Sequence, residues 1–481
     1  VPGHETPKYE RADAQRLAEQ TLGRELTSRE VSRFWAEKSR EEIRQDPGRW
    51  AQLMILKSLM VVNRFEVPDV ESMRVYRDFS WPLRLLAPIW NFGVLCPLGS
   101  FASSQQTHPF NVHDLWEMDR ISDPRVSPDG EWVVFGISSL DAGANRRRSD
   151  LWMVGVDGSG LRPLTTHPAS EFNPRWAPDG SSVFFLSTRS GTSQVWRISV
   201  SGGEARQVTD LPLGLGSMNL SPDGSKLAVS MEVCPDCEDR ACTVDRLSET
   251  EEQVANGVLY DRLFIRHWDT WEDGRRSHLF VLPVEGEAEP VDVMPGVDGD
   301  APSMPFGGPE EYTFTPDGRA VVFSAKMAGD SEPWSTNFDL FVTPIDGSNG
   351  PRPLTGDNPA WDTQPVFSPD GRTLAFLAME RAGYEADRFR ILLQDWPLGE
   401  TRVLTQSWDR SVGSMAFSPD GQTLLVTAQN LGNTSLFTVD VSSGEVTELI
   451  HEGTIRSPSY TDNGIVFGMD HFRSPVELYR A

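Results

Sequence analysis

One stretch of the chain, residues 260–278, combines charged and aromatic side chains of the kind that recognise a charged ligand. It contains Arg266, His267, Asp269 and Glu272 close together. A guanidinium can bind a carboxylate through two parallel hydrogen bonds, and the carboxylates of Asp269 and Glu272 can bind a free amine. We therefore take these four residues as candidate substrate-binding residues.

The same stretch also has a purely structural interpretation. Leu263, Ile265 and His267 alternate as residues of a strand do. An ordinary hairpin would pack its aromatic side chains and pair Arg266 with Asp269. The functional alternative is a recognition arm at the rim or channel of a larger body.

Motifs that would carry catalysis are absent from the sequence. It has no Gly-x-Ser-x-Gly nucleophile elbow, no phosphate loop and no His-Glu-x-x-His, and its eight histidines are scattered. Residues 157–160 and 346–350 are expected to be hairpin tips, and 306–309 a linker turn. We expect no catalytic residue, metal ligand or cofactor in this chain.

Three of the four cysteines lie in one segment, Cys234-Pro-Asp-Cys237-Glu-Asp-Arg-Ala-Cys242. A zinc site needs four ligands at matched spacings, and no second pair or histidine cluster accompanies this segment. A local disulfide is the favoured interpretation, with Cys237 and Cys242 as the preferred pair. Such a bridge implies an oxidising compartment.

An internal repeat must position these candidates. Its signature is a Ser/Thr/Ala-Pro-Asp-Gly turn whose aspartates are Asp129, Asp179, Asp223, Asp317, Asp370 and Asp420, with a degenerate copy at Asp462. Pro presets the turn, Asp bonds its own backbone, and Gly accepts a positive φ. Each turn precedes a short apolar strand, then a third strand, then a fourth ending in Leu-Thr or Val-Thr, as at Leu164-Thr165 and Leu354-Thr355.

Four short strands in each repeat of about 40–50 residues are typical of a β-propeller blade. The seven copies predict a mainly β fold over residues 107–481, a seven-bladed propeller with an insertion at about 231–277. The seventh blade stops after its third strand, so we expect an incomplete blade and a polypeptide that naturally continues. Without a fourth strand there, we expect an unpaired edge and a ring that does not close properly.

Residues 1–106 differ in character from the rest. They read as helices, carry a net charge of +1 against −27 for the remainder, and are strongly apolar in parts of 47–101. Membrane association through 47–101 is therefore expected, although no complete span and no signal peptide is evident. The acidic body argues against nucleic-acid binding.

The repeats, the segment 110–116 and the string around Arg266-His267-Trp268-Asp269 together resemble the propeller of the prolyl oligopeptidase family. Within that family, residues 108–481 are most similar to dipeptidyl-peptidase V-like enzymes and acylaminoacyl peptidases. The resemblance implies the substrate-gating portion of an exported, periplasmic or secreted serine peptidase that acts on short peptides. It also implies an α/β-hydrolase domain, absent from this chain, that holds the catalytic triad.

Two alternatives stay open. A TolB-like propeller shares the turn motif and would mediate protein–protein contacts in the cell envelope without catalysis. Residues 1–106 resemble the tail of bacterial membrane glycosyltransferase-like proteins, which suggests a fused fragment; the rival interpretation is a genuine helical appendage of a membrane-associated peptidase.

Overall fold

The computed structural model describes residues 110–481 except 255, 256, 261, 287, 462 and 463, together with 19–21, 24, 31, 34 and 38. The chain divides into two compact units, Val1–Thr107 and His108–Ala481. The expected membrane-associated stretch 47–101 lies outside the described residues. Within the described part, no helix is both long enough and apolar enough to cross a membrane.

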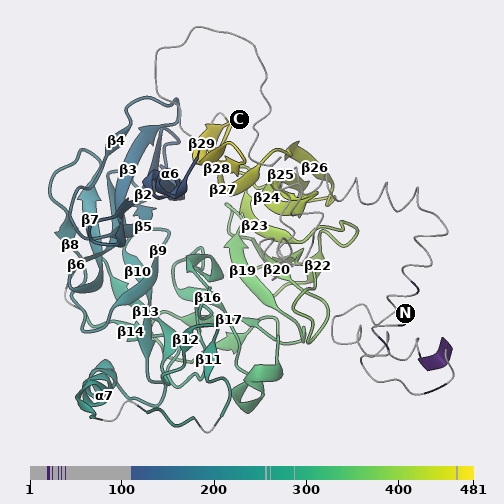
Figure 1. Ribbon diagram of the computed structural model, residues 1–481, viewed down its shortest axis with the longest axis horizontal. Coiled ribbons are helices and arrows are strands. Elements are labelled where there is room, and N and C mark those ends of the chain that lie inside the picture. Colours follow the sequence, from purple (N-terminus) through teal and green to yellow (C-terminus); the bar gives the residue numbers. More distant parts are fainter. Residues whose placement is uncertain are drawn as a thin grey trace. The chain divides into compact units, whose positions relative to one another are not determined.

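The described strands of the second unit form seven antiparallel meanders, numbered here in chain order (Figure 1). Meander 1 contains β1 Arg120–Val126, β2 Trp132–Asp141, β3 Arg146–Gly155 and β4 Arg162–Pro163. Meander 2 contains β5 Glu171–Trp176, β6 Ser182–Ser190, β7 Thr192–Ser199 and β8 Arg206–Gln207. Meander 3 contains β9 Leu215–Leu220, β10 Lys226–Val233, β13 Arg276–Pro283 and β14 Val291–Asp292.

Meanders 4 to 7 follow the same order. Meander 4 contains β15 Tyr312–Phe314, β16 Ala320–Ala325, β17 Asp339–Pro344 and β18 Arg352–Pro353, and meander 5 contains β19 Asp362–Phe367, β20 Thr373–Ala378, β21 Arg390–Asp395 and β22 Thr401–Val403. Meander 6 contains β23 Val412–Phe417, β24 Thr423–Asn430, β25 Asn433–Asp440 and β26 Val446–Ile450. Meander 7 contains β27 Thr454–Thr461, β28 Gly464–His471 and β29 Ser474–Arg480. A single parallel pair, Thr434 with Thr454, joins the last two meanders into one sheet. Figure 1 shows first strands such as β5, β9 and β23 towards the middle of the ring, and short fourth strands such as β8 and β22 outside. This arrangement is a β-propeller.

Among the described residues of this unit, two α-helices interrupt the β pattern. The helix α6, Val112–Glu117, precedes β1 and begins at Asn111, whose side chain accepts from the His113 amide. The helix α7, Arg240–Glu252, lies in the insertion of meander 3. The insertion is shorter than the expected 231–277, because β10 and β13 remain paired as far as Val233 and Arg276 and only 234–275 leave the sheet.

The repeated turn links the first and second strands. In meander 3 the Ser221 hydroxyl donates to the Asp223 carboxylate at 2.6 Å and accepts from the Lys226 amide at 2.9 Å. The same carboxylate accepts from the Ser225 amide, and Gly224 has a φ of +69°. The Ser221 and Asp223 side chains therefore accept from backbone amides that the reversal of the chain leaves without a backbone partner.

The Leu-Thr and Val-Thr steps also have a structural reason. Four threonine hydroxyls accept from a third-strand amide at 2.9 Å: Thr165 from Leu151, Thr209 from Val195, Thr355 from Leu340 and Thr405 from Ile391. Thr165 then donates to the buried Glu171 carboxylate at 2.8 Å. The threonine of each Leu-Thr or Val-Thr step thus ties the end of a very short fourth strand to the third strand through its side chain. Few backbone hydrogen bonds are then needed between these two strands.

A second repeated feature was not recognised from the sequence. Four first strands carry a bulge in which a residue with positive φ precedes a proline: Asp123, Asn173, Gln364 and Ser457. Proline has no amide to leave unpaired at a bulge. From this position Asp123 reaches Arg175 of meander 2, and Gln364 donates to the Gly413 carbonyl of meander 6.

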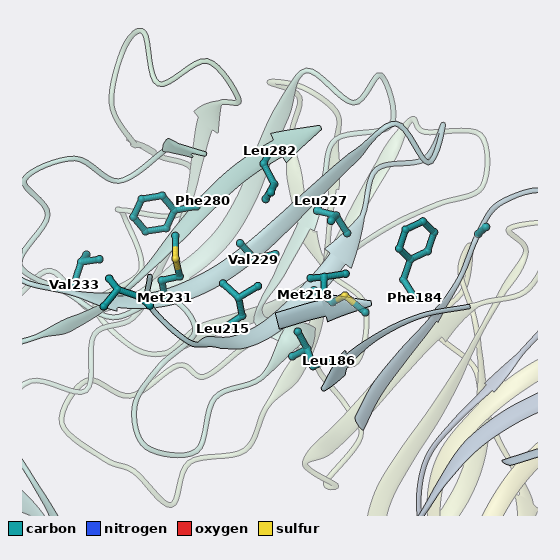
Figure 2. Packing of buried hydrophobic residues seen from close by; sticks show 13 residues of the cluster. Phe184, Leu186, Leu215, Met218, Leu227, Val229, Met231, Val233, Phe280 and Leu282 are labelled. Atoms are coloured by element: carbon teal, nitrogen blue, oxygen red, sulfur yellow. The ribbon is translucent and has the colours of Figure 1, made fainter. Parts of the chain in front are cut away.

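Apolar side chains fill every contact between neighbouring meanders. Figure 2 shows the cluster between meanders 2 and 3, where Phe184 and Leu186 of β6 face Met218, Leu227 and Phe280. Six further clusters occupy the remaining contacts, and the last joins Val133 and Phe135 of meander 1 to Val466 of meander 7.

The expectation that the ring would not close is therefore wrong. Closure depends on side-chain packing between β2, β3 and the seventh meander. A fourth strand on that meander is not needed for these side chains to meet. Within the described residues β29 has no strand on its outer side, as expected.

Candidate functional site

The four candidate residues lie in one small hairpin of the insertion, which we call the arm (residues 263–272). Its strands are β11, Arg266–His267, and β12, Thr270–Trp271, joined by the two-residue turn Trp268-Asp269. Trp268 has a φ of +50°. The Glu272 amide donates to the Ile265 carbonyl at 3.1 Å, which extends the ladder by one pair.

The hairpin separates Arg266 from Glu272. Arg266 is opposite Trp271, His267 is opposite Thr270, and Glu272 is bonded to Ile265. Since successive side chains point to opposite faces, His267 and Glu272 share one face and Arg266 lies on the other. The arm therefore does not present a single mixed-charge site.

The expected pairing of Arg266 with Asp269 is wrong. The Arg266 guanidinium lies over the Trp271 ring, 5.6 Å from its centroid, and donates to the Trp268 carbonyl. The tight turn directs the Asp269 side chain into solvent, and it is exposed. The cation–π contact keeps Arg266 on the aromatic face instead.

Aromatic contacts fix the arm against meander 4. Phe306, in the loop before β15, meets the ring of His267 at 5.6 Å and that of Trp268 at 5.4 Å, both edge to face. Lys326 lies 5.8 Å from the Phe264 centroid. Trp268 and Phe306 still expose 75% and 68% of their surface, so the contact leaves an apolar face open to a ligand.

A charge cluster lies beside the arm around Arg276, at the start of β13. This guanidinium contacts Asp298 at 2.8 Å, Asp300 at 3.1 Å and Glu332 at 2.8 Å. Arg262 also reaches Asp298, at 3.3 Å. Burial raises the pKa of Asp300, and the attraction of Arg276 opposes that rise. The three carboxylates thus share two guanidinium groups, and Lys326 is close enough to interact with Glu332 and Asp300.

Glu272 adds a fourth carboxylate to this cluster. Its side chain is half-buried, and burial raises its pKa while Arg276 opposes the rise and Asp300 and Glu332 add to it. Tyr260 stacks on Trp271 and donates to the Glu272 carbonyl at 3.0 Å, which fixes the backbone. No described residue forms a hydrogen bond or ion pair with the Glu272 carboxylate, so its oxygens are available to a ligand.

An open pocket of about 550 Å³ lies next to the loop of Phe306, between meanders 3 and 4. Its walls combine apolar side chains, glycine backbone and four serines, with the ion pair of Glu232 and Arg275 (2.8 Å) on one side. The lining includes Leu213, Leu215, Met231, Pro302, Met304, Gly307 and Gly308. The pocket is large enough for one or two amino-acid side chains.

Sequence reasoning placed the arm but missed its surroundings. The sequence predicts only a linker turn around Phe306, and the run Asp298-Gly-Asp300 has no recognisable pattern because its partner Arg276 lies 22 residues earlier. Glu332, in the short 3-10 helix Gly329–Trp334, comes from a segment still farther along the chain. In the described residues no three His, Cys, Asp or Glu side chains are placed to hold a metal ion.

The cysteines of the insertion lie at the base of α7. A disulfide joins Cys237 and Cys242, the pair preferred from the sequence, with their Cα atoms 5.6 Å apart. Cys234 has a free, buried thiol. Cys96 lies outside the described residues.

Known proteins are similar to this chain over its propeller. Residues 117–258 match the family model described as a TolB beta propeller domain. A dipeptidyl-peptidase 5 of Porphyromonas gingivalis is 29% identical over 366 residues, which is 76% of this chain and 52% of that protein. The homologues of this propeller include dipeptidyl peptidases. The chain spans about half the length of the curated relatives it matches.

Solved structures share the propeller fold. An acylaminoacyl peptidase of Pyrococcus horikoshii superposes with a TM-score of 0.57 at 18% identity, covering 76% of this chain and 51% of that one. The β-propeller domain of the Trilobed protease from Pyrococcus furiosus has a TM-score of 0.51 at 15% identity, covering 75% of this chain and 95% of that domain.

Proposed function

We propose that residues 108–481 are the substrate-gating domain of a serine peptidase that releases short peptides from peptide N-termini. The similarity to dipeptidyl-peptidase 5 over three-quarters of the chain supports this proposal. The matched part is about half of that protein, so the proposed partner of this domain is an α/β-hydrolase domain with the catalytic serine, aspartate and histidine. The chain by itself would then bind peptides without cleaving them.

Glu272 is the proposed contact for the free amine of the peptide. The observation that carries this role is its carboxylate, half-buried near Asp300 and Glu332 and without a described hydrogen-bond or ion-pair partner. An ammonium group would form charge-assisted hydrogen bonds there. The exposed faces of Trp268 and Phe306 lie beside it for apolar parts of the peptide. Arg266 points away from Glu272, so we propose no joint role for them.

The test measures binding of Ala-Ala-Phe to the full chain through tryptophan fluorescence, since Trp268 and Trp271 lie in the same hairpin as Glu272. N-acetyl-Ala-Ala-Phe removes the ammonium group and is expected to bind about tenfold more weakly, as a lost charged hydrogen bond requires. Glu272→Gln should weaken the free peptide by a similar factor and leave the acetylated peptide unchanged.

Glu249→Gln, an exposed acid on α7, is the matched control and should bind both peptides as the natural chain does. Equal affinity for the two peptides in the natural chain would contradict the role of Glu272. If neither peptide binds at all, the gating function itself is wrong.

Export to the periplasm or outside the cell is also proposed. The Cys237–Cys242 disulfide supports it, because such bonds persist in oxidising compartments. Recovery of the protein from the cytosolic fraction alone, with both thiols reduced, would contradict export.

The match to the TolB propeller model favours a second candidate, a non-enzymatic propeller that binds another envelope protein. The exposed Trp268, Trp271 and Trp334 would then face a protein surface. This candidate predicts that short peptides bind without regard to their N-terminus, whereas a tenfold preference for the free amine would exclude it.

A further inference from the structure

The three cysteines of the insertion are arranged for more than a static bridge. Cys234 follows directly after β10, is only 8% exposed and has no disulfide partner. The Cys237 amide donates to the Cys234 carbonyl at 3.0 Å across the turn Pro235-Asp236. The Cys234 amide is in turn held by the Thr243 hydroxyl of α7 at 3.1 Å.

This turn keeps Cys237 within reach of two sulfur partners. The ends of a β-turn lie less than about 7 Å apart at Cα, and disulfides span Cα separations of about 4.4–6.8 Å. Cys237 is already 5.6 Å from Cys242 on its other side. It can therefore bond to Cys234 or to Cys242 with little movement of the backbone.

An ion pair joins the turn of the cysteine segment to α7. Arg246, one helical turn beyond Cys242, donates to both oxygens of Asp236 at 2.7 and 2.8 Å. This pair and the Thr243 bond keep the turn Pro235-Asp236, with Cys234 and Cys237 on either side of it, against the start of the helix that carries Cys242. The attacking species in disulfide exchange is a thiolate, so the exchange is expected to be fastest at mildly alkaline pH.

The leaving sulfur is also favourably placed. Asp239 caps α7 by accepting from the Cys242 amide at 2.9 Å, so Cys242 is the third residue of a 13-residue helix. The N-terminal end of a helix stabilises negative charge, and a stabilised thiolate leaves more readily. The carboxylates of Asp236 and Asp239 oppose this effect, but Asp236 is neutralised by Arg246.

We propose that Cys234, Cys237 and Cys242 form a thiol–disulfide exchange site. The Cys234 thiolate attacks the sulfur of Cys237, the Cys234–Cys237 bond forms, and the Cys237–Cys242 bond breaks. The electron pair leaves on Cys242, which takes a proton from water. No oxidant is consumed. The product has a free thiol at the start of α7, which can attack a glutathione-class disulfide to form a mixed disulfide and release one thiol.

The consequence is a change in how the insertion is anchored. With the bond between Cys237 and Cys242, α7 is tied to the end of β10. After exchange the covalent tie is confined to the 234–237 turn, and the helix is held only by non-covalent contacts such as those of Arg246 and Thr243. This inference does not depend on peptide binding.

Tryptic mapping of the full chain tests the exchange. The protein is incubated at pH 8 with glutathione at several thiol-to-disulfide ratios, alkylated in acid and digested. Cleavage after Lys226, Arg240 and Arg246 puts Cys234 and Cys237 on one peptide and Cys242 on another. The original bond gives a cross-linked pair with Cys234 alkylated; exchange gives peptide 227–240 with an internal disulfide and alkylated Cys242.

We expect both products in the natural chain and in Cys96→Ser, the matched control. Cys242→Ser isolates the other pair: with oxidised glutathione, which becomes two reduced molecules, it should form Cys234–Cys237 with loss of both free thiols. Amides of α7 should exchange hydrogen faster in Cys242→Ser than in Cys234→Ser. A single cross-linked product at every ratio, or free Cys234 and Cys237 in the oxidised Cys242→Ser variant, would overturn the proposal.

Discussion

Two equivalent places in the repeat each hold a pair of acidic side chains, but with different neighbours. One place lies between meanders 1 and 2 and the other between meanders 4 and 5. Glu171 and Asp362 each begin a first strand and are fully buried. Thr165 donates to Glu171 at 2.8 Å, and Asn358 donates to Asp362 at 2.7 Å. An acid on the neighbouring third strand, Asp150 or Asp339, adds repulsion in both places.

The cations differ between the two places. Arg189 contacts Glu171 at 2.7 Å and Arg148 contacts Asp150 at 2.8 Å. In the aligned strands of meanders 4 and 5, the position of Arg189 is taken by Glu380 and that of Arg148 by Asn337. Burial raises the pKa of Asp362 to about 7, and the attraction of Arg390, which is paired with Glu380 at 3.1 Å, only partly opposes this rise. Burial raises the pKa of Glu171 as well, but there Arg189 binds the carboxylate directly. One backbone design therefore accommodates a buried acid with or without a direct ion pair.

The largest expected effect comes from removing the cation between meanders 1 and 2. Arg189→Met removes the guanidinium, which lies over the Trp196 ring at 4.7 Å, and leaves Glu171 buried without its cation. We expect the free energy of unfolding at pH 7 to fall by about 3–5 kcal/mol, the usual cost of breaking a buried ion pair from one side. Urea denaturation measures it.

Arg206→Met, on the exposed fourth strand β8, is the matched control and should change stability little. A loss at Arg189 as small as that of the control would show that Glu171 is neutral in the folded protein, and the contrast with Asp362 would disappear.

Between meanders 4 and 5 a substitution is expected to raise the free energy of unfolding instead of lowering it. Because the pKa of Asp362 is raised by folding, the folded state holds a proton that the unfolded state releases between pH 3.8 and about 7. Its contribution to stability is present at low pH and is lost as the pH rises through that window. Asp362→Asn should flatten this slope and raise the free energy of unfolding at pH 8 by about 1–3 kcal/mol.

Urea denaturation from pH 4 to pH 8 measures the slope. Asp357→Asn, a nearby exposed acid, should leave it unchanged. An Asp362→Asn variant as pH-dependent as the natural chain would place the buried proton elsewhere.

The smallest effect concerns the exposed turn aspartates, which titrate in the other direction from Asp362. The hydroxyl of Ser221 and the backbone and side chain of Ser225 hold the pKa of Asp223 well below its usual value of 3.8. The stabilising contribution is present above the unfolded value and is lost as the pH falls below about 4. Asp223→Asn should weaken the acid dependence slightly, seen as a smaller drop in melting temperature between pH 5 and pH 3.

A melting curve of Asp223→Asn that drops as steeply as that of the natural chain would show that the turn bonds do not depend on charge. Asp210→Asn, an exposed acid outside the turns, is the comparison.

The repeat unit was predictable because its signals are local. The Ser-Pro-Asp-Gly turn, the apolar second strand and the Leu-Thr step each act within a few residues, and the structure gives each the expected place. The arm, with His267 and Glu272, was also found from a short string. The charges of the interfaces were not, because Arg189 and Glu171 are 18 residues apart and the repeat motif includes neither.

The surroundings of the arm escaped prediction for the same reason. Phe306 and Glu332 reach it from other segments, and hairpin register, which places Arg266 and Glu272 on opposite faces, depends on a turn that starts at Trp268. Closure of the ring was misjudged because strand pairing was given more weight than the packing of Phe135 and Val466.

The insertion of meander 3 leaves and re-enters the sheet at two residues, Val233 and Arg276, that are partners in the ladder. The separation of its two ends is thus set by the neighbouring strands and not by what lies between them. Lengthening a loop whose ends are already fixed adds only a small entropic penalty. Insertions of very different length and chemistry can therefore replace one another at this point during evolution. One propeller can thus acquire a new specificity through the exchange of a single insertion.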